Sequence, residues 1–260
     1  MTKEETPKVY VITGASRGIG RDTALEIGSS GRPVRILAIA RNKDKLLSLK
    51  EELASFPRCD LHIMVADLTV PEQSQIEAWL DQYGPIDGLL NNAGLLINRP
   101  FEELEEADWR ALMEVNLMAP ARLIRLAIPY FPACWQEAGR HRSGQSVQTQ
   151  PADLSAHIVN VSSMGGYQGS AKFPGLSAYS ASKGALAILS ECLAEELKDR
   201  HISVNCLSLG AVQTEMLAEA FPGYQAPLGS QKMAEYFAWF LENGHYFFNG
   251  KVLPVSVSTP

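Results

Sequence analysis

The sequence predicts a single α/β domain over residues 1–260, built on a doubly wound parallel sheet. Three observations predict it: short apolar runs alternate with helical stretches, these runs are continuously apolar, and 260 residues suit one α/β unit. A continuously apolar run is typical of a strand that is buried on both faces of a parallel sheet. We therefore expect three layers, with helices on both faces of the sheet.

Seven apolar runs are expected to form the strands. They are rich in Val, Ile and Leu, and most are followed by a turn and a helical stretch. The runs span 9–13, 34–40, 61–66, 86–91, 157–162, 203–207 and 251–257. Because Pro254 cannot donate a hydrogen bond to a neighbouring strand, the last run is expected to lie at an edge of the sheet or to end there.

Helical stretches are expected between these runs. They span 19–30, 42–55, 71–83, about 108–135 and 178–198. Pro71 begins the third stretch, and Gly84-Pro85 is a strong signal for its end. Pro120 and Pro129 lie inside the fourth stretch and are expected to kink it or to break it into pieces.

The stretch 137–156 does not fit this alternation. It is polar, rich in Ser and Gln, and nearly free of apolar residues, which predicts a surface loop. Because it follows a helix and precedes a strand, we expect it at the amino ends of the strands, whereas ligands bind at the carboxyl ends. We assign it no catalytic role. A simple surface insertion is favoured, and a partner contact stays open.

Charge and composition argue against several classes of function. The net charge of −6 provides no basic field for nucleic acid or an anionic membrane. The polar start of the chain is unlike a secretory signal, and no apolar run is long enough to span a bilayer. The cysteines are widely spaced and show no metal-binding pattern, so we expect no metal site and four buried or partly buried thiols in a cytoplasmic protein. These are Cys59, Cys134, Cys192 and Cys206.

A glycine-rich turn at 13–20 joins the first strand to the first helix. It reads Thr-Gly-Ala-Ser-Arg-Gly-Ile-Gly. Gly14 permits a tight turn, Gly18 lets the backbone approach a pyrophosphate, and Gly20 permits close packing of helix on strand. The free amides at the helix start suit an anion. On this motif alone, a glycine-rich turn without a ligand stays an alternative.

The end of the second strand predicts the type of cofactor. An acidic residue there would bind the adenosine ribose and repel a 2′-phosphate, but this chain has Ala40 followed by Arg41. Arg17 lies in the glycine turn nearby. Two guanidinium groups suit a phosphate, which favours NADP(H) over NAD(H). The alternative is that both are solvated surface arginines.

Tyr179 and Lys183 are four residues apart in a predicted helix and therefore share one of its faces. A phenol with an ordinary pKa of about 10 exchanges protons poorly near pH 7. The Lys183 ammonium is expected to lower this pKa in a site of reduced dielectric constant. Taken alone, an exposed Tyr/Lys pair would be the simpler interpretation.

Six motifs in a fixed order make the chain similar to the short-chain dehydrogenase/reductase family, over about 9–257. Besides the glycine turn and the Tyr/Lys pair, they are the segments at 67–69, 91–94, 115–117 and 162–163. The resemblance implies a Rossmann-type sheet and an NADP(H)-dependent oxidoreductase. It would interconvert a carbonyl and a secondary alcohol on a small, mostly neutral organic substrate, with a 3-oxoacyl compound as one candidate.

The resemblance also implies roles for single residues. Tyr179 would be the general acid in reduction and the general base in oxidation, assisted by Lys183. Ser163, favoured over Ser162 by the alternation of side chains along a strand, would hold the substrate oxygen. Asn116 would support a water in a proton relay. Cofactor contacts are expected from Gly14, Ser16, Arg17, Gly18, Ile19, Gly20, Arg41, Asp67, Leu68, Asn92, Ala93, Gly94, Tyr179, Lys183, Gly210, Val212 and Thr214.

Three departures from the family pattern concern the surroundings of the site. Ser208-Leu209-Gly210 stands where the family has Pro-Gly, and the spacing from Ser163 to Tyr179 is long. The C-terminal residues lack the usual glycine-rich ending, which makes tetramer packing there less certain. None of these changes removes a catalytic side chain.

The substrate loop is expected at about 215–230. It and its surroundings offer a mostly apolar lining, from Leu96, Met164, Tyr167, Phe173, Met216, Leu217, Phe221, Tyr224 and Pro227. Several of these side chains would equally suit core packing. Two other functions stay open: a catalytically silent NADP(H)-binding regulatory protein, and an epimerase or dehydratase. We expect a homodimer or homotetramer formed through the helices near 108–133 and 178–198.

Overall fold

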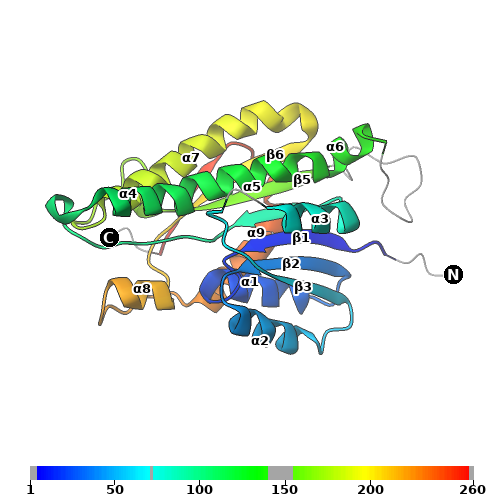
Figure 1. Cartoon of the computed structure of the whole chain (residues 1–260), viewed down its shortest axis with the longest axis horizontal. Coiled ribbons are helices and arrows are strands. Elements are labelled where there is room, and N and C mark those ends of the chain that lie inside the picture. The colour runs from blue at the N-terminus through cyan, green and yellow to red at the C-terminus, as the bar shows by residue number, and fades with distance from the viewer. Residues whose placement is uncertain (1–4, 71–72, 140–154, 258–260) are drawn as a thin grey trace.

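A seven-stranded parallel sheet forms the centre of the computed structural model, which describes residues 5–70, 73–139 and 155–257 (Figure 1). Its order is β3-β2-β1-β4-β5-β6-β7, and each neighbouring pair runs parallel. The strands are β1 (Lys8–Thr13), β2 (Val34–Ala40), β3 (Cys59–Val65), β4 (Gly88–Asn91), β5 (Ala156–Ser163), β6 (Ile202–Leu209) and β7 (Val252–Val255). The predicted doubly wound sheet is confirmed, and β7, which contains Pro254, lies at its edge.

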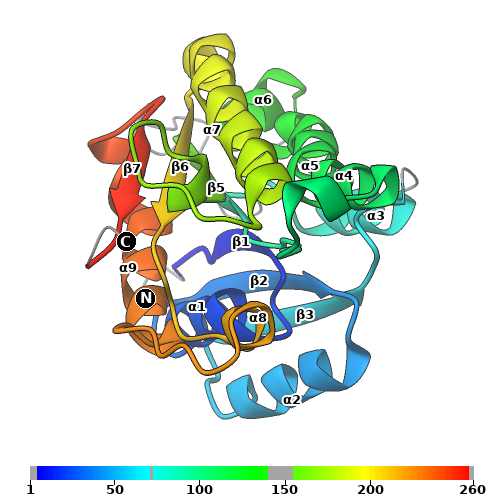
Figure 2. The same ribbon diagram turned by 90° about the vertical axis from the view of Figure 1, so that its left-hand side faces the viewer.

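Helices cover both faces of this sheet. They are α1 (Gly18–Gly28), α2 (Lys43–Leu53), α3 (Ser74–Tyr83), α4 (Glu106–Met113), α5 (Ala119–Ala127), α6 (Pro132–Glu137), α7 (Ser177–Leu197), α8 (Glu215–Ala220) and α9 (Ser230–Asn243). Figure 2 shows α1 and α2 on one side of the sheet and α4 to α7 on the other, and α9 packs beside α1. The 3₁₀ turns span Phe101–Glu103, Ile128–Tyr130, Met164–Gly166, Lys198–Arg200 and Gly244–Tyr246.

The core consists of two main layers, one on each face of the sheet. In β1, Tyr10 and Ile12 pack into the layer beneath α1 and α9, whereas Val9 and Val11 pack into the layer beneath α3, α5 and α7. Successive side chains of a strand point to opposite faces, so a strand between two helical layers must be apolar at every position. This is why the continuous apolar runs predicted the strands.

The long helical stretch expected at 108–135 continues without a gap through Pro120 and is broken only after Pro129, at the extended Phe131. A π-helical turn, Glu114–Met118, joins α4 to α5. Pro120 lies in the first turn of α5, directly after this π-helical turn, and the helix continues through it. Pro129 lies in the 3₁₀ turn that separates α5 from α6.

Several expectations need correction. The third helix begins at Ser74 rather than at Pro71, which lies outside the described residues. Most of the polar loop expected at 137–156 also lies outside them. The stretch 215–230 contains a short helix, α8, and the α9 helix had not been expected at all. Cys192 is exposed because it lies on the solvent side of α7, whereas the other three thiols are buried or half-buried as expected.

The structure has no helix in its described part that is long and apolar enough to cross a membrane.

Candidate active site

A cavity of about 860 Å³ opens where the β1, β2, β4, β5 and β6 strands end. All five strands point their carboxyl ends at it, and β1 and β4 are the strands at which the chain order of the sheet reverses. This is the position at which doubly wound sheets bind ligands. The α8 helix and the segment around Phe173 contribute to its walls.

Nearly all the residues singled out in the sequence line this one cavity. The structure places seventeen of them there: Gly14, Ser16, Arg17, Gly18, Ile19, Arg41, Asp67, Leu68, Asn92, Ala93, Gly94, Ser163, Tyr179, Lys183, Gly210, Val212 and Thr214. The two that do not line it are Gly20 and Asn116. Both lie directly behind its wall, where their contacts are structural.

The glycine turn is fixed to the end of β4 by Thr13. Its hydroxyl accepts hydrogen bonds from the backbone amides of Asn92 and Ala93, each at 3.0 Å. Gly14 has a φ of +68°, and a Cβ there would lie 2.9 Å from the Cα of Ala93. Only glycine permits this backbone conformation and this close approach. The wall beside the turn is therefore open backbone rather than side chains.

Gly20 is a correction to the expected cofactor contacts. It lies in the first turn of α1, where a Cβ would be 2.4 Å from Nδ2 of Asn92 and 2.7 Å from the carbonyl oxygen of Gly14. Gly20 thus lets the helix pack against the glycine turn and does not reach the cavity. The packing role predicted for it from the motif is the one that fits.

The end of the cavity beside β2, where adenosine is expected and which is called the adenosine end below, contains one cation that sequence reasoning missed. Besides Arg17 and Arg41, the cavity is lined by Lys45 and Asn42, and the Asn42 side chain caps α2 by accepting a hydrogen bond from the Lys45 amide at 2.9 Å. Lys45 is four residues after Arg41, at the start of a predicted helix. That spacing was the available signal for placing it near the same ligand.

Asp67 is held in its ionised form at this end of the cavity. The Thr69 amide and hydroxyl donate hydrogen bonds to its carboxylate at 2.9 and 2.8 Å. These hydrogen bonds lower the pKa of Asp67, and the charge of Arg41 lowers it further. The carboxylate is therefore ionised at neutral pH and available as an acceptor.

Tyr179, Ser163 and Lys183 come together deeper in the cavity. Tyr179 and Lys183 lie in the first two turns of α7, and Ser163 is the last residue of β5. The Ser163 hydroxyl lies close enough to the Tyr179 phenol to act on its pKa. The Lys183 ammonium donates to the carbonyl oxygen of Val161 at 2.8 Å.

The choice between the two serines agrees with their contacts. Ser162 donates its hydroxyl to the carbonyl oxygen of Lys183 at 2.8 Å and so anchors α7 to β5. Ser163 accepts a hydrogen bond from the Gly165 amide at 3.1 Å and lies beside the Tyr179 phenol. Of the two hydroxyls, that of Ser163 is the one beside the phenol.

Burial is the largest influence on the pKa values of Tyr179 and Lys183. It raises the pKa of Tyr179, although the hydrogen bond with Ser163 partly offsets the increase. The direction is opposite to the one predicted from the Tyr/Lys spacing, because loss of hydration disfavours the charged phenolate. Burial also lowers the pKa of Lys183, to about 8. The sequence could not reveal this, since burial of α7 is a tertiary property.

Asn116 connects three elements behind the cavity. Its side-chain amide donates to the Leu95 carbonyl at 2.9 Å and to the Ser182 hydroxyl at 3.0 Å, while its oxygen accepts from the Leu95 amide at 2.9 Å. Ser182 in turn donates to the carbonyl oxygen of Tyr179 at 2.7 Å. The Asn116 side chain thus positions the start of α7, and its expected support of a water in a proton relay stays a prediction.

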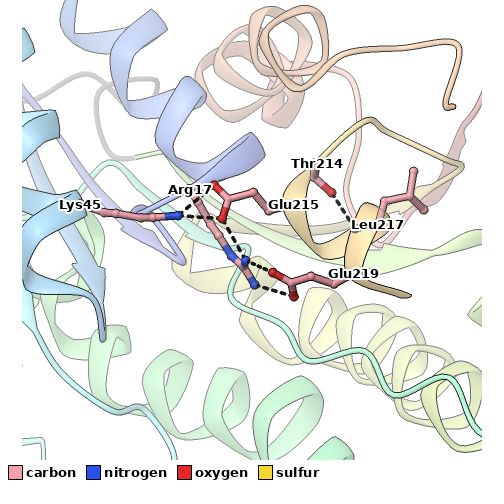
Figure 3. Close-up of polar contacts among 6 residues, drawn as sticks. All are labelled: Arg17, Lys45, Thr214, Glu215, Leu217 and Glu219. Atoms are coloured by element: carbon pink, nitrogen blue, oxygen red, sulfur yellow. Dashed lines mark hydrogen bonds and ion pairs between the residues drawn. The ribbon is translucent and has the colours of Figure 1, made fainter. Parts of the chain in front are cut away.

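The opposite wall of the cavity contains Thr214 and Gly210, two of the expected cofactor contacts, and most of the expected apolar lining. Thr214 caps α8 by accepting a hydrogen bond from Leu217 at 3.2 Å (Figure 3). The amide of Gly210 donates to Val255 at 3.0 Å, which fixes this backbone although the family's proline is missing. The apolar lining includes Leu96, Met164, Phe173, Met216, Leu217, Phe221 and Tyr224, whereas Tyr167 and Pro227 do not line the cavity.

Comparison with known proteins identifies the family of the chain. Residues 8–225 match the family model described as short chain dehydrogenase. The chain is 33% identical over 214 residues to a 3-oxoacyl-(acyl-carrier-protein) reductase of Thermotoga maritima, covering 80% of this chain and 76% of that protein. It is 30% identical over 211 residues to L-xylulose reductase of Caenorhabditis elegans, covering 81% and 74%.

Solved structures agree as well. A 3-ketoacyl-(acyl-carrier-protein) reductase from Brucella melitensis, complexed with NADH, superposes with a TM-score of 0.77 at 25% identity, covering 96% of each chain. L-sorbose reductase from Gluconobacter frateurii, complexed with NADPH and L-sorbose, has the same fold, with a TM-score of 0.76 at 23% identity over 100% and 98% of the two chains. With its motifs gathered in one cavity and matched over most of its length, the chain belongs to the short-chain dehydrogenase/reductase family of oxidoreductases.

Proposed function

We propose that this protein is an NADP(H)-dependent oxidoreductase that interconverts a carbonyl and a secondary alcohol on a small, mostly neutral organic substrate. One observation carries the proposal: the neighbouring Tyr179 and Ser163 side chains lie in the wall of the same cavity as the glycine turn. A proton donor and an anion-binding turn in one cavity suit a reaction that moves a hydride and a proton. The reductase names of the relatives support the same class of reaction.

The described residues fit a dinucleotide. The open backbone at Gly14 leaves room for a pyrophosphate beside the amides at the start of α1, and the ionised Asp67 offers an acceptor to the adenine. Thr214 and Val212 would hold the nicotinamide end. When bound, the cofactor supplies the hydride, while the protein orients it and controls the proton.

Tyr179 performs the proton step in this proposal. In reduction, its hydroxyl donates the proton to the substrate oxygen, and in oxidation its phenolate accepts the proton from the alcohol. Ser163 donates a hydrogen bond to the same oxygen and stabilises the negative charge that develops there. The Lys183 ammonium offsets the charge that remains on the phenolate, which burial otherwise disfavours.

Preference for NADP(H) is expected to depend on the cations of the adenosine end. Replacing Arg17 and Arg41 together by Ala should weaken binding of NADPH at least tenfold, an order-of-magnitude estimate for charge-assisted phosphate contacts. Binding of NADH should change much less. Dissociation constants for both cofactors, measured by quenching of protein fluorescence, test this expectation. An equal loss for NADPH and NADH would contradict the assignment of the 2′-phosphate.

The pKa of Lys183 predicts how the rate of reduction depends on pH. Because this pKa is lowered to about 8, the ammonium is lost as the pH rises through that value. The value of kcat/KM for reduction should then fall about tenfold per pH unit above about pH 8. In Lys183→Arg the side chain stays charged, so its lower rate should lose this decline. A wild-type rate that stays flat to pH 10 would contradict the role of Lys183.

The apolar lining supports a neutral substrate, and a 3-oxoacyl compound is one candidate. A catalytically silent NADP(H)-binding regulatory protein is the alternative. It is disfavoured because a protein that merely binds the cofactor does not need a buried phenol beside a serine hydroxyl. Absorbance of the reduced nicotinamide, followed with a panel of ketones, aldehydes and 3-oxoacyl thioesters at fixed NADPH, tests the two. Consumption of NADPH with at least one substrate supports the enzyme, whereas binding without turnover supports the regulator.

We also propose that two copies associate through the outer faces of α5 and α7. Ile188 on α7 is 60% exposed, and Met118, directly before α5, is 45% exposed. Exposed apolar side chains that form one contiguous patch are typical of protein interfaces. Sedimentation should therefore show Ile188→Glu shifted toward the monomer, while Ile188→Val keeps the wild-type assembly. An unchanged sedimentation rate for Ile188→Glu would exclude this face.

A further inference from the structure

Two carboxylates of α8 reach across the cavity to the cations of the adenosine end. Glu215 lies 2.7 Å from the ammonium of Lys45 and 3.1 Å from the guanidinium of Arg17, so it bridges the two. Glu219, one helical turn later, lies 2.6 Å from Arg17. Figure 3 shows the Arg17 side chain between the two carboxylates, with Lys45 approaching Glu215 from α2. One anionic group, the Glu215 carboxylate, therefore already binds two cations at once.

The three elements that meet here come from distant parts of the chain. Arg17 belongs to the glycine turn, Lys45 to the first turn of α2, and Glu215 begins α8. All three residues line the cavity, next to Ala40 and Arg41. In NADP(H)-binding proteins of this architecture, an arginine near the end of the second strand accommodates the 2′-phosphate, and Arg41 stands there.

We propose that Lys45 determines specificity for the adenosine 2′-phosphate, and that Glu215 competes with this phosphate for Lys45 and Arg17, so that phosphate binding releases α8. The inference rests on the proposed use of NADP(H). It adds a specificity-determining lysine and a competing carboxylate to the two arginines expected from the sequence.

The ion pairs of Glu215 are weak enough for a phosphate to displace its carboxylate from Lys45 and Arg17. All four side chains are partly exposed, with 36% of Arg17 and 53% of Glu215 accessible, and ion pairs in such positions contribute little. A phosphate carries more charge than one carboxylate and offers three acceptor oxygens to the same cations. The pairs are formed at neutral pH, because hydrogen bonds from Lys45 and Arg17 lower the pKa of Glu215.

Release of α8 would also change the end of the cavity where the substrate is expected to bind. Glu215 directly follows Thr214, whose hydroxyl caps α8, and Met216 and Leu217 belong to the apolar lining. A cofactor with a 2′-phosphate would thus loosen the wall that contacts the substrate, whereas a cofactor without it would leave the ion pairs in place. The two cofactors are then distinguished by their effect on α8 as well as by affinity.

Binding of 2′,5′-ADP and 5′-AMP to the whole chain, measured by calorimetry at low salt, tests the proposal. These two probes differ by the 2′-phosphate alone. Glu215→Gln should bind 2′,5′-ADP about two- to fivefold more tightly than the wild type, the range expected from losing exposed ion pairs. Lys45→Met should bind it about tenfold more weakly. Neither change should alter the affinity for 5′-AMP, and Lys43→Met, on the same helix but outside the cavity, should alter neither affinity.

Two further measurements separate competition from a merely structural effect. In the Lys45→Met background, Glu215→Gln should tighten binding of 2′,5′-ADP less than it does in the wild type, since the shared partner is gone. Amide hydrogen exchange over 215–220 should accelerate with 2′,5′-ADP and stay unchanged with 5′-AMP. Weaker binding of 2′,5′-ADP by Glu215→Gln, or unchanged binding, would overturn the competition.

The outcome for the wild type distinguishes this inference from the proposed function. If the wild type binds 2′,5′-ADP no better than 5′-AMP, the preference for NADP(H) is wrong and the inference falls with it. If the wild type prefers 2′,5′-ADP and Lys45→Met keeps that preference in full, NADP(H) stands and the role of Lys45 alone is refuted.

Discussion

Tyr179→Phe should lower kcat about 10²- to 10⁴-fold, because it removes the proposed proton donor and little else. This corresponds to about 3–5 kcal/mol of transition-state stabilisation. The ring would stay packed against Leu112 and Leu176, so the fold and the cavity should be preserved. Ser163 would keep the hydrogen bond that it accepts from the Gly165 amide.

Binding of NADPH is the measurement that separates this loss from damage to the site. The dissociation constant of Tyr179→Phe for NADPH should stay within about tenfold of the wild type, since one hydrogen bond contributes about 0.5–1.5 kcal/mol. Tyr167→Phe is the matched control: it removes a phenol hydroxyl from the neighbouring segment, outside the cavity lining, and should keep the wild-type rate. Near-full turnover by Tyr179→Phe would show that another group moves the proton.

The strands could be predicted from the sequence because their environment repeats along the chain. β1 and β2 lie between two helical layers, so each position is apolar and the whole run is visible. α9 was missed although its signal was present. Met233, Phe237, Phe240 and Leu241 follow a helical spacing and bury that face against the core. α8 is too short to show such a period.

The candidate site likewise has some features that could be predicted from the sequence and others that could not. Its backbone features, such as the turn at Gly14, could be predicted because few residue types permit them. Properties set by tertiary packing could not be predicted. The raised pKa of Tyr179 depends on how deeply α7 is buried, and the carboxylate of Glu215 reaches Lys45 across elements that are 170 residues apart. Neither the pKa of Tyr179 nor the contact between Glu215 and Lys45 is visible in a local sequence pattern.

The second large effect concerns stability and involves a histidine outside the site. His157 in β5 is fully buried, and its Nδ1 lies 3.2 Å from the carbonyl oxygen of Leu241 while its Nε2 lies 2.9 Å from the Asn205 side-chain nitrogen. Nδ1 must donate and Nε2 must accept, which requires the neutral ring. Asn205 cannot reverse its amide without loss, because its oxygen accepts from the Lys251 amide at 3.0 Å.

Burial, with a smaller contribution from the nearby His245, therefore lowers the pKa of His157 to about 3. His245 itself has a lowered pKa, caused by burial and by the charge of Lys8, with Asp87 acting in the opposite direction. Between the ordinary pKa of about 6.5 and the folded value, the unfolded chain binds the proton and the folded chain does not. Stability is then present in full above about pH 6.5 and decreases as the pH falls.

We expect the free energy of unfolding to drop by about 2 kcal/mol between pH 7 and pH 5 on account of His157 alone. Urea unfolding at both pH values, at one protein concentration, gives this difference. His157→Gln keeps an acceptor for Asn205 but cannot titrate, so it should lose most of the pH dependence whatever its stability at pH 7. His201→Asn, at an exposed position of positive φ that asparagine tolerates, should keep the wild-type dependence. An equal drop in wild type and His157→Gln would mean that other groups, with His245 the first to test, bind the proton on unfolding.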